Sequence, residues 1–322
     1  MTLRLQRRRF RFALLQPLRT ASGELLERCG WLLRLNDGQG GVGWGEVAPL
    51  QQQQFTACEH ALAVLPDELP QARLEAGLQE LPGALGFGLG AALGELQGLV
   101  GAASTQGWLK APEPALLLPA GEAMLAALEA AAASAGGLEG RTFKWKVATA
   151  PDGLERQLLD QLLQRLPPTA RLRLDANGGW DRSTAQAWMQ RLRDEPRLAW
   201  LEQPLAVKDQ TGLEQLAELG PVALDESLHQ HPELRRSWSG WQVRRPALEG
   251  DPRGLLRELQ AGVPQRMLST AFETGIGRRW LEHLAGLQAR GPTPAAPGLA
   301  PGWTPSGALF STDPEQVWAA AA

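Results

Sequence analysis

The sequence predicts an α/β protein in which a parallel β/α barrel follows a smaller α+β domain. Three observations support this fold class. From about Pro114 onward, short apolar segments alternate with helical patterns, as in proteins with a parallel sheet. The alternation repeats roughly every 20–30 residues, the length of one strand–helix unit in a barrel of about 250 residues. Several of the apolar segments end in charged residues, and the carboxyl ends of barrel strands meet at one mouth.

The N-terminal part differs from the rest and predicts antiparallel strands followed by helices. Arginines and apolar residues interleave from Leu3 to Leu15, which is typical of an edge strand. The segment Gly38-Gln-Gly40 predicts a turn between two later strands. We expect strands at 10–15, 30–35 and 41–47, and helices at 51–65, 71–78 and 84–101.

The remaining elements form the predicted barrel, which seven or eight strand–helix units would close. We expect its strands at 115–118, 143–147, 172–174, 200–201, 222–224, 241–243 and 266–269, with a weak last strand near Gly298. Helices are expected at 122–133, 154–166, 183–193, 251–261 and 276–288. The predicted domains are therefore an α+β capping domain (1–108), a barrel with the metal site (109–292), and a C-terminal segment (293–322) that returns through the last barrel strand to the cap.

Composition and charge argue against several classes of partner. The net charge is −3 with no basic stripe, which disfavours nucleic acid. No apolar run reaches the length of a signal-peptide core near the start, or of a membrane span elsewhere. Cys29 and Cys58 form neither a disulfide framework nor a zinc pattern. We therefore expect a cytoplasmic protein with reduced cysteines, and either a monomer or a homo-oligomer.

Three acids, Asp175, Glu202 and Asp225, stand at the same point of successive predicted strands. Carboxylate oxygens are the ligands of hard cations, and such a site keeps positions open for a substrate carboxylate. We expect Mg²⁺, with Mn²⁺ as the alternative, because histidines are absent from these strand ends apart from two just past the fifth strand. Each acid alone is equally consistent with a helix cap, but three at equivalent positions favour a metal site.

Residues beside these acids predict supporting roles. Asn177 is consistent with either a water-mediated metal contact or an ordinary turn, whereas Arg173 shares a strand face with Asp175 and is expected to brace the carboxylates from below. Glu226 follows Asp225, and strand alternation would turn it to the opposite face.

Lys144 and Lys146 lie on one face of their strand, with Trp145 on the other. Adjacent ammonium groups and a nearby metal would lower a lysine pKa from its usual value of about 10.4. A lysine with such a pKa is a useful general base. The alternative is a pair of solvated lysines, which is disfavoured because lysine is rare in this chain.

These motifs resemble the enolase superfamily, muconate-lactonising subgroup, and within it the o-succinylbenzoate synthase family. The resemblance covers nearly the whole chain and is carried by Pro17–Thr20, Gly43–Pro49, Phe143-Lys-Trp-Lys146, Asp175-Ala-Asn177, Glu202-Gln-Pro204, Asp225-Glu-Ser227 and Ser269–Gly275. It implies a modified (β/α)7β TIM-type barrel with an N-terminal capping domain. Sites of this superfamily use a Lys or His base with Mg²⁺ to stabilise an enediolate.

The resemblance assigns roles residue by residue. Asp175, Glu202 and Asp225 would hold the metal, and Lys146 would remove the proton with help from Lys144. Ser269 and Thr270 would contact the succinyl part of a small carboxylate substrate. Arg19, Thr20 and Ser22 would form a loop that closes over the barrel mouth, although an ordinary polar loop is equally consistent with these residues.

Arg245 departs from the family pattern, because it stands in Val243-Arg-Arg-Pro-Ala-Leu248 where relatives carry a lysine. Guanidinium is a very poor base, so a reaction that needs a base on each face of the substrate is disfavoured. Arg245 remains able to lie over the substrate ring as a cation–π partner, worth about 0.5–2 kcal/mol, or to balance enolate charge. A lost activity, or an ion pair with Glu202 or Asp225, is also consistent with this change.

The resemblance implies a lyase that dehydrates 2-succinyl-6-hydroxy-2,4-cyclohexadiene-1-carboxylate to o-succinylbenzoate, a step towards menaquinone or phylloquinone. An N-succinylamino acid racemase or a muconate cycloisomerase is the alternative within the superfamily. A barrel that binds a metal without catalysis is a third hypothesis.

Overall fold

The computed structural model describes residues 1–20 and 23–321, and the chain divides into two compact units. Unit 1 comprises Met1–Pro112 and Arg244–Ala322, and unit 2 comprises Glu113–Val243. The first boundary lies close to the end of the predicted capping domain. Residues 244–292, placed in the barrel by the sequence, cluster with unit 1.

Unit 1 begins with an antiparallel sheet in the order β3-β2-β1-β4. Its strands are β1 (Thr2–Thr20), β2 (Gly23–Asn36), β3 (Val42–Val47) and β4 (Glu68–Pro70). The helices that follow are α1 (Gln52–Val64), α2 (Gln71–Gly77) and α3 (Gly83–Leu96), with a 3-10 turn η1 (Leu78–Glu80). The later part of the unit contains η2 (Pro246–Leu248), α10 (Arg253–Gln260), β11 (Arg266–Leu268), α11 (Gly275–Gln288), η3 (Pro301–Trp303), η4 (Ala308–Phe310) and α12 (Pro314–Ala320).

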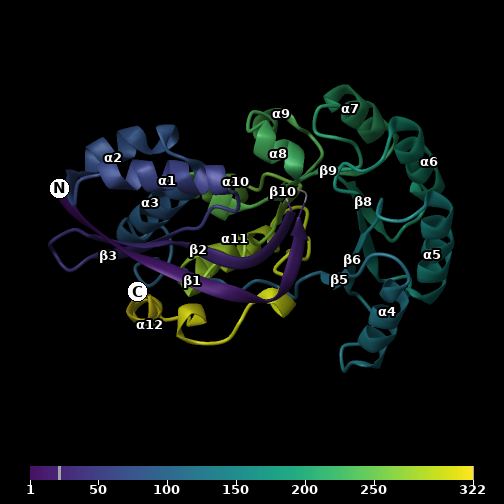
Figure 1. Cartoon of the computed structure of the whole chain (residues 1–322), viewed down its shortest axis with the longest axis horizontal. Helices are drawn as coiled ribbons and strands as arrows, with labels where there is room; N and C mark the ends of the chain where they lie inside the picture. The colour runs from purple at the N-terminus through teal and green to yellow at the C-terminus, as the bar shows by residue number, and fades with distance from the viewer. Residues whose placement is uncertain (21–22, 322) are drawn as a thin grey trace. The chain divides into compact units, whose positions relative to one another are not determined.

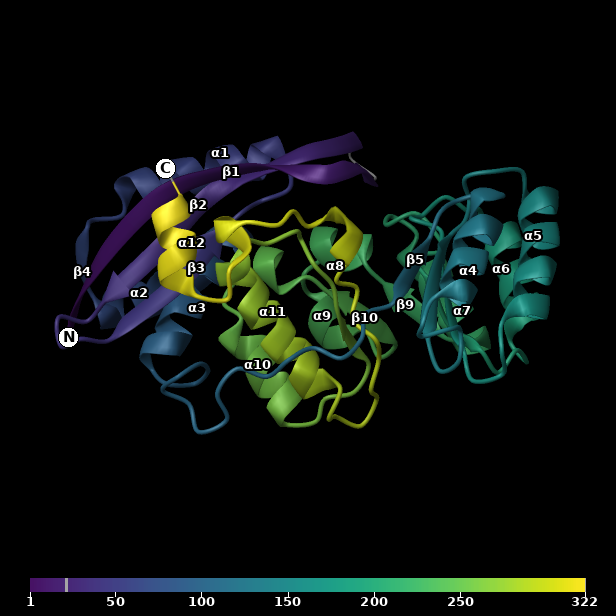
Figure 2. The ribbon, with the colours of Figure 1, turned by 90° about the horizontal axis from the view of Figure 1, so that it is seen from below.

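The sheet of unit 1 is buried on both faces, which explains the unbroken apolar run in β2. Leu33 and Leu35 pack with residues of α1, α2 and α3, whereas Leu32 packs with Trp44 and with residues of α11 and α12. Figure 2 shows α1 and α12 on opposite sides of β1 and β2. Glycines in β3 bring α3 close, because a Cβ on Gly43 would overlap a carbonyl oxygen of α3.

Unit 2 is a parallel β/α unit whose strands follow the spatial order β5-β6-β7-β8-β9-β10. These strands are β5 (Leu116–Leu118), β6 (Thr142–Lys146), β7 (Arg171–Asp175), β8 (Leu198–Glu202), β9 (Val222–Leu224) and β10 (Trp241–Arg244), the last residue of which belongs to unit 1. The helices are α4 (Ala123–Ala133), α5 (Asp152–Arg165), α6 (Arg182–Leu192), α7 (Gln210–Leu219), α8 (Glu226–Gln230) and α9 (Leu234–Ser237). In Figure 1, α4 to α7 line the outer side of β5 to β9.

The apolar residues of unit 2 form one core between strands and helices. Trp145, Leu172 and Leu174 point to this core and are inaccessible to solvent, together with Trp188 of α6. Because side chains alternate along a strand, the residues between them point to the inner face of the sheet. The chain therefore has the predicted fold class, a modified TIM-type parallel β/α sheet together with an N-terminal α+β domain.

Some predicted elements differ from the structure. The first strand extends to Thr20 and pairs with β2, with Arg19 opposite Glu24, so the loop expected at Arg19 and Thr20 is instead the end of a long hairpin. Ser22 lies outside the described residues. The weak last strand near Gly298 is a single parallel bridge to Ser269. Helices α7 and α12 are not among the helices predicted from the sequence. Within residues 1–20 and 23–321, no helix is both long enough and apolar enough to cross a membrane.

Candidate active site

The structure brings the predicted metal ligands together in unit 2 through strand register. Lys146 pairs with Asp175, and Asp175 pairs with Glu202 across the parallel ladder. Glu202 in turn pairs with Ala223, two residues before Asp225. Parallel strands direct their carboxyl ends to the same edge. The three acids and the lysine therefore form one row at that edge, and the side chains of the acids are almost wholly buried.

Lys144 is held by two of these carboxylates. Its Nζ lies 2.7 Å from Oδ2 of Asp175 and 2.7 Å from Oε1 of Glu202. Burial by itself would lower the pKa of Lys144, but attraction to Asp175, Glu202 and Asp225 outweighs burial and raises the pKa above its usual value. The prediction of a lowered pKa is therefore wrong for Lys144, because its ammonium contacts carboxylates rather than a second ammonium.

Lys146 differs from Lys144 in its contacts. It is the last residue of β6 and lies on the same strand face as Lys144, two positions away. Its side chain is half-buried. Among the residues that the structure describes, its ammonium has neither a hydrogen-bond partner nor an ion-pair partner. The two lysines are thus distinguished by geometry: Lys144 is tied to the carboxylates, and Lys146 is not.

Asp175, Glu202, Asp225 and Glu226, together with Lys144, form a charged cluster. The pKa shifts of this cluster indicate that it holds too little positive charge to balance its carboxylates. Burial raises the pKa of Glu202 against the attraction of Lys144, and repulsion from Asp175 and Asp225 adds to the rise. Burial also raises the pKa of Glu226 to about 7, again with help from Asp225 and Asp175. Because these carboxyl groups and Lys144 all retain protons more tightly than usual, the cluster would be stabilised by an additional cation.

The donor set suits a hard cation, because Asp175, Glu202 and Asp225 are all carboxylates and two of them already accept contacts from the ammonium of Lys144. Two acceptor oxygens nearby, Oδ1 of Asn177 and Oε2 of Glu226, are buried and have no hydrogen-bond partner among the residues that the structure describes. Oxygen ligands of this kind suit Mg²⁺ or Mn²⁺ rather than zinc. Within residues 1–20 and 23–321, no three His, Cys, Asp or Glu side chains stand in mutual metal-binding geometry, as expected where an ammonium separates two of the acids.

Asn177 and Glu226 lie on the same side as the carboxylates and contact each other. Asn177 donates from Nδ2 to Oε1 of Glu226 at 2.9 Å, and its backbone N donates to Oδ1 of Asp175 at 3.1 Å. The predicted orientation of Glu226, towards the opposite face, is wrong because β9 ends at Leu224 and α8 begins at Glu226. Helical geometry, not strand geometry, therefore directs this side chain.

Arg173 lies in the layer beneath the acids and contacts an aromatic ring. Its Cζ lies 4.1 Å from the centroid of the Trp200 ring, a cation–π geometry. The indole Nε1 of Trp200 donates to Oε2 of Glu202 at 3.3 Å. Burial lowers the pKa of Arg173 to about 10, against the attraction of Glu202. Trp200 thus links the guanidinium to the carboxylate.

The contacts of Gln203 are not predicted from the sequence. Gln203 is completely buried beside Glu202, and its side chain contacts the segment that carries Asp225. The signal in the sequence was its place between Glu202 and Pro204, in the Glu-Gln-Pro motif.

The remaining predicted residues belong to unit 1. Arg245 donates from its guanidinium to the carbonyl oxygen of Thr270 at 2.8 Å. The hydroxyl of Thr270 donates to Glu273 at 2.6 Å and accepts from the backbone N of Phe272 at 2.8 Å. Within the described part of the chain, the hydroxyl of Ser269 makes only a long contact of 3.4 Å, with the carbonyl of Gly298. Of the two hydroxyls predicted to bind substrate, that of Ser269 is therefore the one that can more readily form a hydrogen bond with a substrate.

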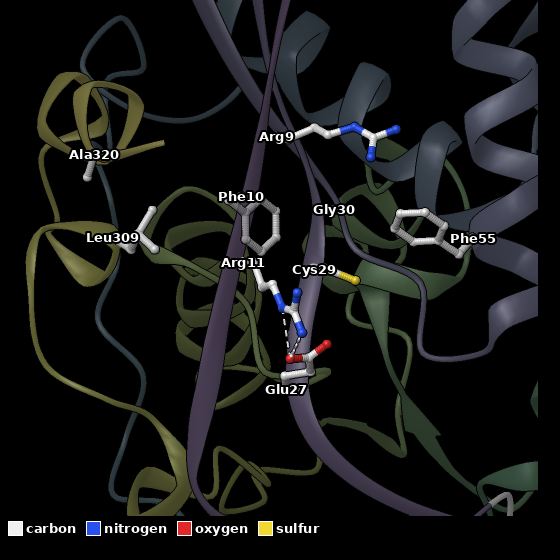
Figure 3. Close-up of a pocket in the computed structure, with 9 residues that line it drawn as sticks. All are labelled: Arg9, Phe10, Arg11, Glu27, Cys29, Gly30, Phe55, Leu309 and Ala320. Carbon is white, nitrogen blue, oxygen red and sulfur yellow. Dashed lines mark hydrogen bonds and ion pairs between the residues drawn. The ribbon is translucent and has the colours of Figure 1, made fainter. Parts of the chain in front are cut away.

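A hollow of about 410 Å³ lies elsewhere in unit 1, around β1 and β2. Figure 3 shows Arg9, Arg11, Cys29 and Phe55 among its lining residues. Arg11 donates to Glu27 at 2.8 Å, and Arg9 is paired with Glu59. Among the residues whose side chains the structure describes, none of those predicted for chemistry lines this hollow, and its arginines already have acidic partners.

Comparison with known proteins identifies the family. The enolase C-terminal domain-like family matches residues 123–240. The o-succinylbenzoate synthase of Thermosynechococcus vestitus is 36% identical over 297 residues, 88% of each chain. That of Yersinia enterocolitica is 29% identical over 81% of this chain and 79% of its own.

A solved structure gives the same result for the fold. The crystal structure of o-succinylbenzoate synthase from Thermosynechococcus elongatus BP-1, complexed with Mg in its active site, has a TM-score of 0.81 and 32% identity. The match covers 98% of this chain and 99% of that one. The carboxylate row, the two lysines and these similarities agree, and the chain belongs to the enolase superfamily and, within it, to the o-succinylbenzoate synthase family.

Proposed function

We propose that this protein dehydrates 2-succinyl-6-hydroxy-2,4-cyclohexadiene-1-carboxylate to o-succinylbenzoate with the help of Mg²⁺. The observation that carries the proposal is the register of unit 2, which sets Lys146, Asp175 and Glu202 side by side on three neighbouring strands. The family relationship supports the substrate class.

Asp175, Glu202 and Asp225 would hold the metal at the carboxyl ends of their strands. When bound, Mg²⁺ polarises the substrate carboxylate and neutralises the negative charge that develops there. Lys144 keeps two of these carboxylates directed at one point through its paired contacts. The cluster's shortage of positive charge is the physical reason for its affinity for a divalent cation.

Lys146 is the proposed general base. In its neutral form it takes the proton from the carbon next to the substrate carboxylate, and it then gives that proton to the departing hydroxide, which leaves as water. The C–H and C–O bonds break and a ring double bond forms, so the product is aromatic. One residue on one face is sufficient for this elimination, and no oxidant or second substrate is required.

Arg245 is proposed to act as a fixed positive group. Guanidinium does not lose its proton in proteins, and the hydrogen bond to the Thr270 carbonyl restrains it. It therefore remains able to stabilise negative charge or the face of a ring, but not to serve as a second base. This argues against the racemase alternative.

Metal removal tests the proposed reaction directly. Purified protein stripped of metal with EDTA is expected to form no o-succinylbenzoate from the diene carboxylate, and added Mg²⁺ is expected to restore product formation, measured by absorbance. Equal product with and without Mg²⁺ would contradict the role of the metal. No product under either condition would favour the non-catalytic hypothesis.

Solvent exchange distinguishes the lyase from the racemase. In D₂O, we expect deuterium to enter the α-carbon of at most one enantiomer of an N-succinylamino acid, because Lys146 supplies a base on one face only. Proton NMR measures the exchange, with Arg245→Lys as the control that places an amine at the second position. Exchange of both enantiomers at similar rates by the unaltered protein would reject the single-base assignment.

A further inference from the structure

Gln203 has an unusual backbone and no exposure to solvent. It lies between Glu202 and Pro204 and has a φ of 37°, in the left-handed region that residues other than glycine, asparagine and aspartate rarely adopt. Such a conformation persists only where the surrounding structure holds it. The contacts of its side chain show what holds it here.

The amide of Gln203 uses its full hydrogen-bonding capacity. Its Oε1 accepts from the backbone N of Asp225 at 3.3 Å and from that of Ser227 at 3.0 Å. Its Nε2 donates to Oγ of Ser227 at 2.7 Å and to the carbonyl oxygen of Leu205 at 2.9 Å. Two acceptor and two donor positions are all that a glutamine amide offers, so this side chain is completely satisfied.

These contacts begin where the strand ladder between β8 and β9 stops. The last paired residues of the two strands are Glu202 and Ala223, and the backbone N of Gln203 donates to the Ala223 carbonyl at 2.8 Å. Asp225 lies beyond that pairing, with φ −121° and ψ −77°, outside regular strand geometry. Beyond the ladder, the segment that carries Asp225 is therefore bound to β8 through the side-chain amide of Gln203, which takes the place of backbone hydrogen bonds.

We propose that Gln203 is a positioning residue for divalent-metal binding, which sets the separation of the carboxylates of Glu202 and Asp225. The inference rests on the proposed function, because it takes both acids to be metal ligands. Hydrogen bonds that orient ligands without touching the metal commonly change metal affinity by about 10–100-fold when they are removed. The side chain of Gln203 orients Asp225 by accepting a hydrogen bond from the backbone N of Asp225. Gln203 also directly follows Glu202 in the chain.

Gln203→Met tests the proposal, because methionine has a similar length but no amide. The affinity for Mg²⁺ alone, measured by isothermal titration calorimetry on the full chain, is expected to fall by about tenfold or more. Ser227→Ala is the matched control: it removes the hydroxyl that accepts from Nε2 but leaves both backbone hydrogen bonds to Oε1. Its Mg²⁺ affinity is expected to stay near that of the unaltered protein.

Thermal unfolding of the same variants separates positioning from a merely structural role. If Gln203→Met lowers Tm while Mg²⁺ binds as before, Gln203 only supports the fold and the proposal is overturned. Should Gln203→Met fail to fold, Gln203→Asn takes its place. Asparagine suits the left-handed backbone, but its side chain is shorter than that of glutamine by one methylene, which moves the amide away from its partners. The same loss of Mg²⁺ affinity is therefore expected. An unaltered protein that binds no Mg²⁺ would instead overturn the proposed function, and this inference with it.

Discussion

Lys146→Ala is expected to lower kcat for o-succinylbenzoate formation by about 10²–10⁴-fold, the usual contribution of a general base. The physical reason is that Lys146 is the lysine whose ammonium is not committed to a carboxylate, whereas Lys144 contacts both Asp175 and Glu202. Steady-state absorbance measurements give the rate, and calorimetry with Mg²⁺ shows whether the metal site is retained.

Three variants define what Lys146 contributes. Lys146→Arg keeps the positive charge but not the basicity, so it is expected to be as inactive as Lys146→Ala. Lys208→Ala makes the same lysine-to-alanine change at an exposed position and is expected to have no effect. Arg245→Lys is expected to leave turnover largely intact. A near wild-type rate for Lys146→Ala would show that another residue removes the proton.

The placement of the acids could be predicted from sequence because it depends on one geometric rule. Asp175 and Glu202 each end a short apolar strand, and parallel strands bring such positions to one edge. The repeat of about 20–30 residues per strand–helix unit indicates which positions are equivalent. The residue at the end of β7, the residue at the end of β8 and the residue just past the end of β9 were therefore enough to predict the row, even though its members are separated by many residues in sequence.

The contacts around that row could not be predicted in the same way. The ion pairs of Lys144 depend on side-chain distances across three strands, which residue order does not determine. The direction of Glu226 depends on where β9 ends and α8 begins, and a boundary error of one or two residues changes the geometry that applies. The left-handed backbone of Gln203 is held by contacts with a later segment, so no local pattern indicates it.

The missed helix α7 has a local explanation. Its buried face is short, with Leu213 and Leu216 in the core, and glycine occurs within it at Gly212 and directly after it at Gly220. Glycine lowers helix propensity by about 1 kcal/mol relative to alanine. The helix forms because packing on the parallel sheet outweighs that cost. The side chain of Asp209 also accepts a hydrogen bond from the backbone N of Gly212, which caps the first turn.

Glu202→Gln is expected to reduce kcat/KM by about a thousandfold, which corresponds to about 4 kcal/mol of lost stabilisation of the transition state. Glu202 is completely buried and accepts hydrogen bonds from both Lys144 and Trp200. Glutamine has nearly the same shape but lacks the negative charge that attracts the metal. Titration with Mn²⁺ followed by electron paramagnetic resonance is expected to show a parallel loss of metal affinity.

Glu226→Gln is the matched control, because it makes the same chemical change at an acid that contacts Asn177 instead of Lys144. If Asp175, Glu202 and Asp225 are the ligands, this variant keeps them all and is expected to lose at most about tenfold in Mn²⁺ affinity, the lower range for a residue outside the ligand set. Equal losses in both variants would instead mean that Glu226 is itself a ligand. Unchanged Mn²⁺ binding by Glu202→Gln would remove from the site the acid of β8, the strand that lies between β7 and β9, and the proposed metal centre would have to be abandoned.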